Sequence, residues 1–369
     1  MTDPRVEKLA DVLVNYSVAV QPDDKVVVQG STLSAPLLKA VYAKVLQAGG
    51  HPLIQVALPG TGELLYRHAS DEQLQHIHEP EKLIVETFDA FIGIGGAENT
   101  KALSNVDPAK MVLHNRAQIE LRKTFMQRSA SGELRWVGTL FPTHAYAQEA
   151  EMSLSEYEDF VYGACMPDLN DPVGYWQHFS AWQQKIVDWF KGKDRIHVTG
   201  PETDLRMSVA GRAFVNADGQ KNMPDGEVFT GPVEDSVEGH VRFSYPVIRQ
   251  GREVTGVQLW FENGKVVKAS AEKNEDFLLQ TLDTDAGARY VGEFAIGTNA
   301  GITRFTRHML FDEKMTGSFH MALGAGIVET GSKNESAIHW DMLCDLRAGG
   351  EIWVDDELLY KDGEFVIDF

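Results

Sequence analysis

The sequence predicts two domains of different class: an α/β domain with a parallel sheet over residues 1–194, and a β-rich α+β domain over residues 195–369. Before residue 194, β-branched runs alternate with segments of helical periodicity, which is the pattern of strands joined by crossover helices. After residue 194, short strand-like runs follow one another with turn signals between them. A chain of 369 residues also has the length of two or three domains of about 150 residues each.

A strand–helix–strand unit opens the first domain. Residues 25–30, KVVVQG, form a β-branched run between PDD and GS, which is typical of a buried strand. Apolar residues recur at helical spacing through residues 34–48, and Gly49 and Gly50 end that helix. Residues 51–58, HPLIQVAL, indicate the next strand, so the unit has the βαβ order of a parallel sheet.

The same alternation continues along the chain. Further strands of the first domain are predicted at residues 90–96 and 135–142. Helices are predicted at residues 70–77, 108–130, 154–164 and 173–191. In the second domain the predicted strands lie within residues 195–200, 204–211, 240–248 and 253–271. The segment ENGK marks a hairpin turn inside the last of these ranges.

Composition limits the classes of partner and compartment. The formal net charge of −20 argues against nucleic acid or an anionic membrane as a partner, because both require a basic surface. The acidity suits a metal ion or a substrate with a free amine, although solubility alone also accounts for it. Cys165 and Cys344 form no C-x-x-C motif, and we find no signal-peptide pattern and no apolar run of about 20 residues. We therefore expect a cytoplasmic protein without a membrane partner.

Two motifs of the first domain resemble ligand sites but predict ordinary structure. The segment GIGGAEN follows a predicted strand, yet Glu98 stands where a dinucleotide-binding G-x-G-x-x-G needs its third glycine. We interpret it as a tight structural turn. His76 and His78 form an H-x-H at the end of a predicted helix, where residues two apart do not face each other. We do not predict a metal site there.

The second domain carries polar residues in surroundings that predict burial. Glu293 lies in the apolar run YVGEFAIGTN, where a lone carboxylate is costly unless it is paired or bound to a metal. His339 and Asp341 lie two apart in AIHWDML, so on a strand they point to one face while Ile338 and Trp340 pack on the other. Taken singly, such residues are more often satisfied core groups or solvated side chains.

Together with three more residues they form a chemically matched set. The six candidate metal ligands are Glu227, Glu293, Glu313, His320, His339 and Asp341. Six ligands are too many for one tetrahedral zinc ion, but they suit two divalent ions that share a carboxylate. The mixture of oxygen and nitrogen donors favours Zn, Co or Mn.

Five segments of the chain, in this order, also resemble a known family. They are NMPDGEVFTGP, GEFAIGTN, LFDEK, HMALG and NESAIHWDML. The chain resembles the aminopeptidase T/aminopeptidase S family of dinuclear metallo-aminopeptidases nearly from end to end. The resemblance implies a peptide-hydrolysing enzyme that uses a metal-activated water. It also implies a homodimer, in which the first domain helps to form an enclosed cavity.

The resemblance assigns roles to individual residues. Glu227 corresponds to a ligand of one metal, and Glu293 corresponds to the carboxylate shared by both ions. Glu313, His320, His339 and Asp341 correspond to the remaining ligands, and two residues are inserted between Glu313 and His320 relative to the family. Glu227 or Glu293 is also the candidate catalytic group for moving a proton to the leaving amine.

One departure from the family pattern concerns catalysis. The family has a tyrosine seven residues after the histidine of H-x-A-L-G, and this chain has Ile327 there. An isoleucine cannot donate a hydrogen bond to a developing oxyanion, so we expect weakened turnover. Two alternatives stay open: a mononuclear iron ring-cleaving dioxygenase of the same fold, which uses two histidines and an aspartate, and a metal-binding, peptide-binding protein that has lost turnover.

Overall fold

A parallel sheet forms the centre of the first of two structural units. The computed structural model describes residues 3–249 and 251–369, and the first unit comprises the chain up to Trp176 together with Gly219–Pro224. Its sheet has the strand order β2-β1-β3-β4-β8, and all neighbouring pairs are parallel. The strands are β1 (Lys25–Ser31), β2 (His51–Ala57), β3 (Ala90–Gly95), β4 (Arg135–Leu140) and β8 (Asn222–Met223). The predicted parallel α/β architecture is confirmed.

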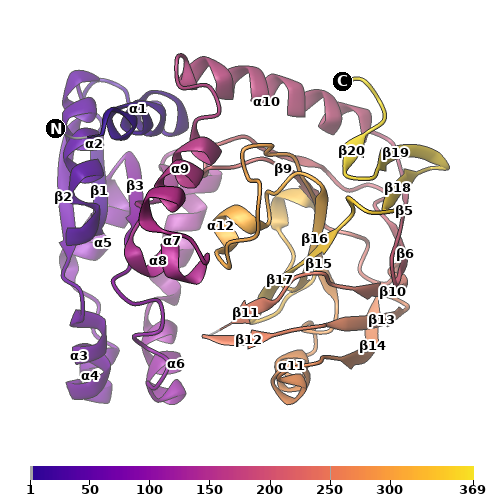
Figure 1. Cartoon of the computed structure of the whole chain (residues 1–369). Coiled ribbons are helices and arrows are strands. Elements are labelled where there is room, and N and C mark those ends of the chain that lie inside the picture. Colours follow the sequence, from indigo (N-terminus) through magenta and orange to yellow (C-terminus); the bar gives the residue numbers. More distant parts are fainter. Residues whose placement is uncertain (1–2, 250) are drawn as a thin grey trace. The chain divides into compact units, whose positions relative to one another are not determined.

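Helices connect these strands (Figure 1). Helix α2 packs against β1 and β2 and buries Leu37, Leu38 and Val41, which are apolar positions of its predicted helical pattern. The helices are α1 (Pro4–Val12), α2 (Ala35–Gln47), α3 (Thr61–His68), α4 (Asp71–Leu74), α5 (Glu79–Thr87), α6 (Pro108–Ala117), α7 (Ile119–Ala130), α8 (His144–Glu149) and α9 (Leu154–Cys165), with a π-helical turn at Leu13–Ser17 and a 3₁₀ turn at Thr32–Ser34.

Two helix predictions in this unit need correction. The helix predicted over residues 108–130 is two helices, α6 and α7, which meet at Gln118, where ψ is −3° rather than the roughly −42° of a regular α-helix. The helix predicted over residues 70–77 is the four-residue α4, which begins at a capping box between Ser70 and Gln73.

His76 and His78 follow α4, and their ring centroids lie 4.8 Å apart. The GIGGAEN turn is held in part by the Ser31 hydroxyl, which donates to the Gly96 carbonyl at 2.7 Å.

The second unit comprises Gln177–Asp218 and Asp225–Phe369. The division therefore falls inside α10 (Pro172–Trp189), earlier than the boundary expected near residue 194. The buried indole of Trp176 donates to the Cys165 carbonyl at 2.7 Å, which ties the start of α10 to the first unit. The segment Gly219–Pro224 also belongs to the first unit, because β8 pairs with β4.

Antiparallel sheets make up the second unit, in agreement with the predicted β-rich class. The larger sheet has eight strands in the order β14-β13-β10-β6-β5-β18-β19-β20. A five-stranded sheet has the order β17-β16-β15-β9-β7, and β11 pairs with β12 in a hairpin. The strands of the larger sheet and the hairpin are β5 (Arg195–Gly200), β6 (Thr203–Ser208), β10 (Glu238–Arg242), β11 (Val247–Arg249), β12 (Arg252–Val254), β13 (Gln258–Glu262), β14 (Lys265–Ser270), β18 (Glu351–Val354), β19 (Glu357–Lys361) and β20 (Glu364–Phe365).

The five-stranded sheet positions the candidate site. Its strands are β7 (Val215–Ala217), β9 (Glu227–Thr230), β15 (Val291–Gly297), β16 (Ser318–Gly324) and β17 (His339–Asp345). One face of this sheet contributes Val228, Phe294, Ile296, Phe319, Met321, Trp340 and Met342 to the apolar core of the unit. The unit also contains α11 (Glu275–Leu282), α12 (Met309–Asp312) and a 3₁₀ turn at Val328–Thr330. Among the described residues of the whole chain, none of the helices has the length and apolarity to span a membrane.

Candidate metal centre

Strand alternation brings five of the six predicted ligands to one face of the five-stranded sheet. On β17, His339 and Asp341 alternate with the buried Trp340, as predicted. In the register of the sheet, Glu293 lies opposite Ala322, and Ala322 lies opposite Asp341. Partners opposite each other in a ladder point to the same face, so the side chains of Glu293 and Asp341 share one face. The small Ala322 lies between them.

The other strand ligands follow from the same register. His320 lies opposite Ala295, His339 lies opposite Gly324, and Glu227 lies opposite Gly297. Each of these ligands has a small residue opposite it on at least one neighbouring strand, while on β17 the residue opposite His320 is Leu343. The face therefore leaves room for imidazole and carboxylate groups that approach one another over the middle of the sheet.

Two glycines set the aim of the glutamates. The pairing register shifts between Val291 and Glu293, which is a β-bulge, and bulges re-aim the side chains beside them. A Cβ on Gly292 within this bulge would lie 2.3 Å from the Ala325 carbonyl oxygen, so only glycine fits. Gly226, before Glu227, has φ +126°, and a Cβ there would lie 2.7 Å from the Asn299 side chain.

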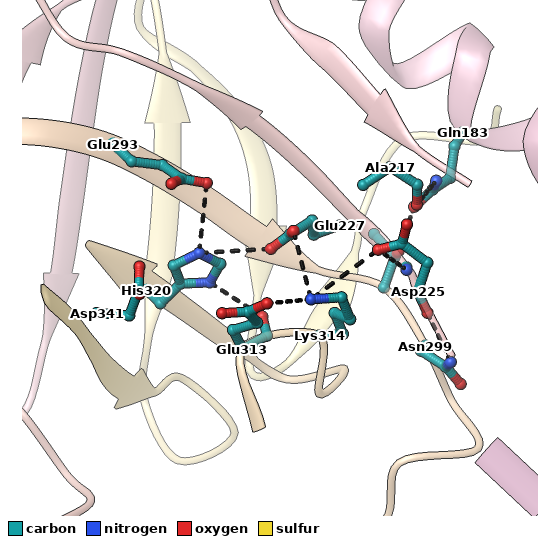
Figure 2. Close-up of polar contacts among 12 residues, drawn as sticks. Gln183, Ala217, Asp225, Glu227, Glu293, Asn299, Glu313, Lys314, His320 and Asp341 are labelled. Atoms are coloured by element: carbon teal, nitrogen blue, oxygen red, sulfur yellow. Dashed lines mark hydrogen bonds and ion pairs between the residues drawn. The ribbon is translucent and has the colours of Figure 1, made fainter. Parts of the chain in front are cut away.

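Glu313 reaches the centre from a helix end rather than from a strand. It is the C-cap residue of α12, and its backbone carbonyl accepts a hydrogen bond from Nδ1 of His320 at 2.9 Å. Figure 2 shows the Glu313 carboxylate beside His320. The structure thus brings all six predicted residues into one cluster, including Glu313 after the two-residue insertion.

The central contact is made by Glu293, whose two oxygens face two different imidazoles. Oε1 lies 3.6 Å from Nε2 of His320, and Oε2 lies 3.1 Å from Nε2 of His339. On either side, Oε2 of Glu227 lies 3.4 Å from His320 Nε2, and Oδ1 of Asp341 lies 3.5 Å from His339 Nε2. The cluster is therefore a chain of alternating carboxylates and imidazoles with Glu293 in the middle.

Backbone hydrogen bonds fix which nitrogen of each histidine faces the cluster. Nδ1 of His320 contacts the Glu313 carbonyl, and Nδ1 of His339 contacts the Ala325 carbonyl at 2.8 Å. Since a carbonyl oxygen only accepts, both Nδ1 atoms carry the hydrogen. Metal-binding histidines are oriented in this way, with the second ring nitrogen left for the ion. The Nε2 atoms are therefore the donors available to a cation.

Burial and the neighbouring charges shift the pKa values within the cluster. Burial raises the pKa of Glu227 to about 8. Burial also opposes ionisation of Glu293, but its pairing with the two imidazoles outweighs this effect and lowers its pKa to about 2. Burial disfavours the imidazolium forms, yet the carboxylate partners raise the pKa of His320 to about 10 and that of His339 to about 11. Without an ion, protons on the histidines balance part of the carboxylate charge.

The donor atoms fit a divalent cation in three overlapping groups. The inner group is Glu227, Glu293 and His320, all buried, and the outer group is Glu293, His339 and Asp341. A third group combines Glu313, His320 and Asp341. Within each group, ligand atoms lie within 4.8 Å of one another. Oε2 of Glu227 is buried and makes no hydrogen bond with the residues that the structure describes, so beyond its 3.4 Å contact with His320 Nε2 it remains available to an ion in the inner group.

The sequence did not reveal two residues that complete the cluster, Lys314 and Asp225. The side chain of Lys314 has no exposed surface, and its Nζ lies 3.6 Å from Oε1 of Glu227, 4.0 Å from Oδ1 of Asp225 and in contact with Oε1 of Glu313 (Figure 2). These carboxylates keep the pKa of Lys314 above its usual range despite burial. The signal in the sequence was a lysine beside a predicted ligand in LFDEK, but a lysine next to a glutamate is ordinarily solvated.

Comparison with known proteins identifies the family. Residues 2–365 match the protein family described as "Thermophilic metalloprotease (M29)". The chain belongs to this family. Aminopeptidase T of Thermus thermophilus is 26% identical to this M29 chain over 400 residues, which cover 97% of this chain and 95% of that protein. Aminopeptidase 2 of Geobacillus stearothermophilus is 25% identical over 403 residues, with 94% of each chain covered. The predicted metallo-aminopeptidase family and enzyme class are confirmed.

Solved structures agree with the fold. Wild-type AmpT from Thermus thermophilus superposes on the M29 chain with a TM-score of 0.86 at 23% identity, covering 99% of both chains. The 2,5-dihydroxypyridine dioxygenase from Pseudomonas putida KT2440 gives a TM-score of 0.59 at 13% identity, covering 98% of this chain and 97% of the other. The second likeness shows that proteins of another activity share this architecture.

Proposed function

We propose that this M29 chain is an aminopeptidase that removes N-terminal residues from peptides at a centre of two divalent ions. The observation that carries the proposal is the geometry of Glu293. Its two oxygens point toward different imidazoles at 3.6 and 3.1 Å, as a carboxylate shared by two ions would. His320 cannot be the shared ligand, because only its Nε2 is available to an ion.

The inner group (Glu227, Glu293, His320) is proposed to hold one ion and the outer group (Glu293, His339, Asp341) the other, with Glu313 as an additional ligand. Zn, Co or Mn suits these oxygen and nitrogen donors. Divalent ions held there supply Lewis acidity toward the peptide carbonyl and activation of a water.

Charge balance supports the number of ions. When ionised, Asp225 and the four glutamate and aspartate ligands carry five negative charges, and Lys314 carries one positive charge. Two divalent ions would bring the sum to zero, since four positive charges remain to be supplied. With a single ion, protons on Glu227 and His320, whose pKa values lie at about 8 and about 10 without an ion, would have to supply the remaining positive charge.

The chain's own residues then orient the substrate and move the proton. The acidic surroundings favour a substrate with a free α-ammonium group. Glu227 and Glu293 are the candidates for carrying the proton to the leaving amine. Ile327 precedes the 3₁₀ turn at Val328–Thr330, and its side chain offers no donor to a developing oxyanion. We therefore propose slower turnover than a tyrosine at this position would give.

The homodimer and the cytoplasmic location are also proposals. The first domain is proposed to pair with that of a second copy and to help enclose the cavity. Strand β2 supports this, since it lies at the edge of its sheet and exposes Leu53, Ile54 and Val56 by 43%, 36% and 48%. An exposed apolar edge strand is ordinarily covered in an assembly.

Metal analysis and a peptide panel test the proposed function. The protein is purified without added metal, its ions are identified and counted, and peptides are offered with Co, Zn or Mn. Free peptides should lose their N-terminal residue, and the same peptides with an acetylated N-terminus should not. Cleavage of acetylated peptides, or no hydrolysis with any of the three metals, would contradict the proposal.

The alternative activity is ring cleavage at a single iron. The shared architecture with the Pseudomonas putida dioxygenase and the presence of His320, His339 and Asp341 favour it. Glu227, Glu293 and Glu313 argue against it, because a mononuclear iron site needs one carboxylate. One iron per chain and oxygen consumption with a hydroxypyridine would decide for the dioxygenase.

A further inference from the structure

Lys314 is a fully buried cation that belongs to no candidate ligand group. Its side chain has no exposed surface, and it reaches Glu227, Asp225 and Glu313 (Figure 2). Burying an unpaired ammonium group is strongly unfavourable, so the three carboxylates are what keep this charge inside the protein. Lys314 therefore places a fixed positive charge at one side of the metal centre.

The contacts of Lys314 are distributed unequally over the two ion positions. Its Nζ lies 3.6 Å from Oε1 of Glu227, which belongs to the inner group. Within residues 3–249 and 251–369, the ion pairs of Lys314 include no member of the outer group, Glu293, His339 or Asp341. The ammonium group thus contacts one ligand of the inner group, Glu227, and the additional ligand Glu313, but no ligand of the outer group.

This asymmetry has an electrostatic consequence. A divalent ion in the inner group would bind beside a like charge, which repels it, and would have to share Glu227 with Lys314. An ion in the outer group would bind where both imidazole and carboxylate donors are free of Lys314. Asp225 works in the opposite direction, because its carboxylate lies 4.0 Å from Lys314 Nζ and offsets part of the repulsion without being in any ligand group.

We propose that Lys314 makes the two ion positions unequal, so that the outer group holds its ion tightly and the inner group holds a weaker, exchangeable ion. This inference rests on the proposed two-ion centre. Lys314 is a positioning residue here, and it sets the metal concentration at which the centre is complete. The protein purified without added metal should then retain about one ion per chain, and hydrolysis should rise when a second ion is supplied.

Equilibrium titration of the chelated protein with Co²⁺ tests the inference without measuring activity. Calorimetry and visible absorption should show two steps in the wild type, the second weaker by on the order of tenfold or more. Glu227→Gln should abolish the weak step and leave the tight one. Lys314→Met should tighten the weak step by about tenfold, whereas Asp225→Asn should weaken it. Opposite shifts from two neighbouring substitutions cannot come from general damage to the fold.

Controls keep each outcome decisive. Lys361→Met removes a lysine that lies outside the centre and pairs with Glu351, with 2.9 Å between Nζ and Oε1. It should leave both steps unchanged. If Lys314→Met does not fold, Lys314→Gln and Asp225→Asn provide the same comparison. Two equal steps in the wild type, or a weak step that Lys314→Met leaves unaltered, would overturn the inequality of the two ion positions but not the two-ion centre. A single ion in every variant would overturn the two-ion centre itself.

Discussion

Replacing Glu293 by glutamine tests the central feature of the proposed centre. Glu293→Gln keeps the size of the side chain and one acceptor oxygen but removes the charge that both ligand groups share. Two unit charges at the 3.1 Å between Oε2 and His339 Nε2 attract by about 5 kcal/mol at an effective dielectric of about 20. A loss of this order for a bound cation corresponds to roughly 10³-fold in Kd or more.

The substitution should therefore reduce the metal content from two ions per chain to at most one, and hydrolysis should fall to background. Metal content is measured by emission spectroscopy after dialysis against dilute metal, and turnover is measured on a peptide with a free N-terminus. Glu351→Gln is the matched control, because Glu351 lies outside the cluster and pairs with Lys361, with 2.9 Å between Oε1 and Nζ. Retention of two ions by Glu293→Gln, with turnover within tenfold of the wild type, would refute the role of a shared carboxylate.

Three further predictions concern the ions, the missing donor and pH. Removing the ions with a chelator should lower the melting temperature in scanning calorimetry, since ions at 100 times their Kd stabilise by about 2.7 kcal/mol each, and an unchanged midpoint would count against tightly bound ions. Ile327→Tyr should raise kcat in a steady-state peptide assay by roughly 10²–10³-fold. The control Val328→Tyr, at a neighbouring position that is 84% exposed, should leave kcat unchanged. Equal kcat values in the two variants would show that the missing phenol does not limit turnover. Burial, together with the charge of Lys314, lowers the pKa of His308 to about 4. Between about pH 6.5 and pH 4 the His308 imidazole is therefore neutral in the folded protein but protonated in the unfolded protein. This contribution destabilises the protein as pH falls from about 6.5 to 4, and urea denaturation should show His308→Gln gaining up to about 3 kcal/mol relative to the wild type over that range; a difference that does not vary with pH would contradict the buried neutral imidazole.

Local patterns were sufficient to predict much of this protein. The β-branched run at residues 25–30 became β1 because consecutive apolar residues suit a strand buried on both faces, and the helical spacing at residues 34–48 became α2 because it suits one buried helix face. The alternation of His339, Trp340 and Asp341 became one polar and one buried face of β17 because side chains alternate along any strand. The helix break at Gln118 was not predictable, since the sequence has neither glycine nor proline there.

Residues far apart in the sequence required the tertiary structure. The sequence by itself determined which residue types were available as ligands and which of them lie on a common strand face, because those properties depend on neighbours along the chain. Only the folded chain decided that the β15–β16–β17 register lets Glu293 face both His320 and His339, and that the Gly292 bulge aims it there. The burial of Lys314 among three carboxylates from two distant segments, Asp225–Glu227 and Glu313, was likewise a product of packing. The electrostatic potential that a site exerts on an ion depends on distances in space, and the spacing of residues along the chain does not specify those distances.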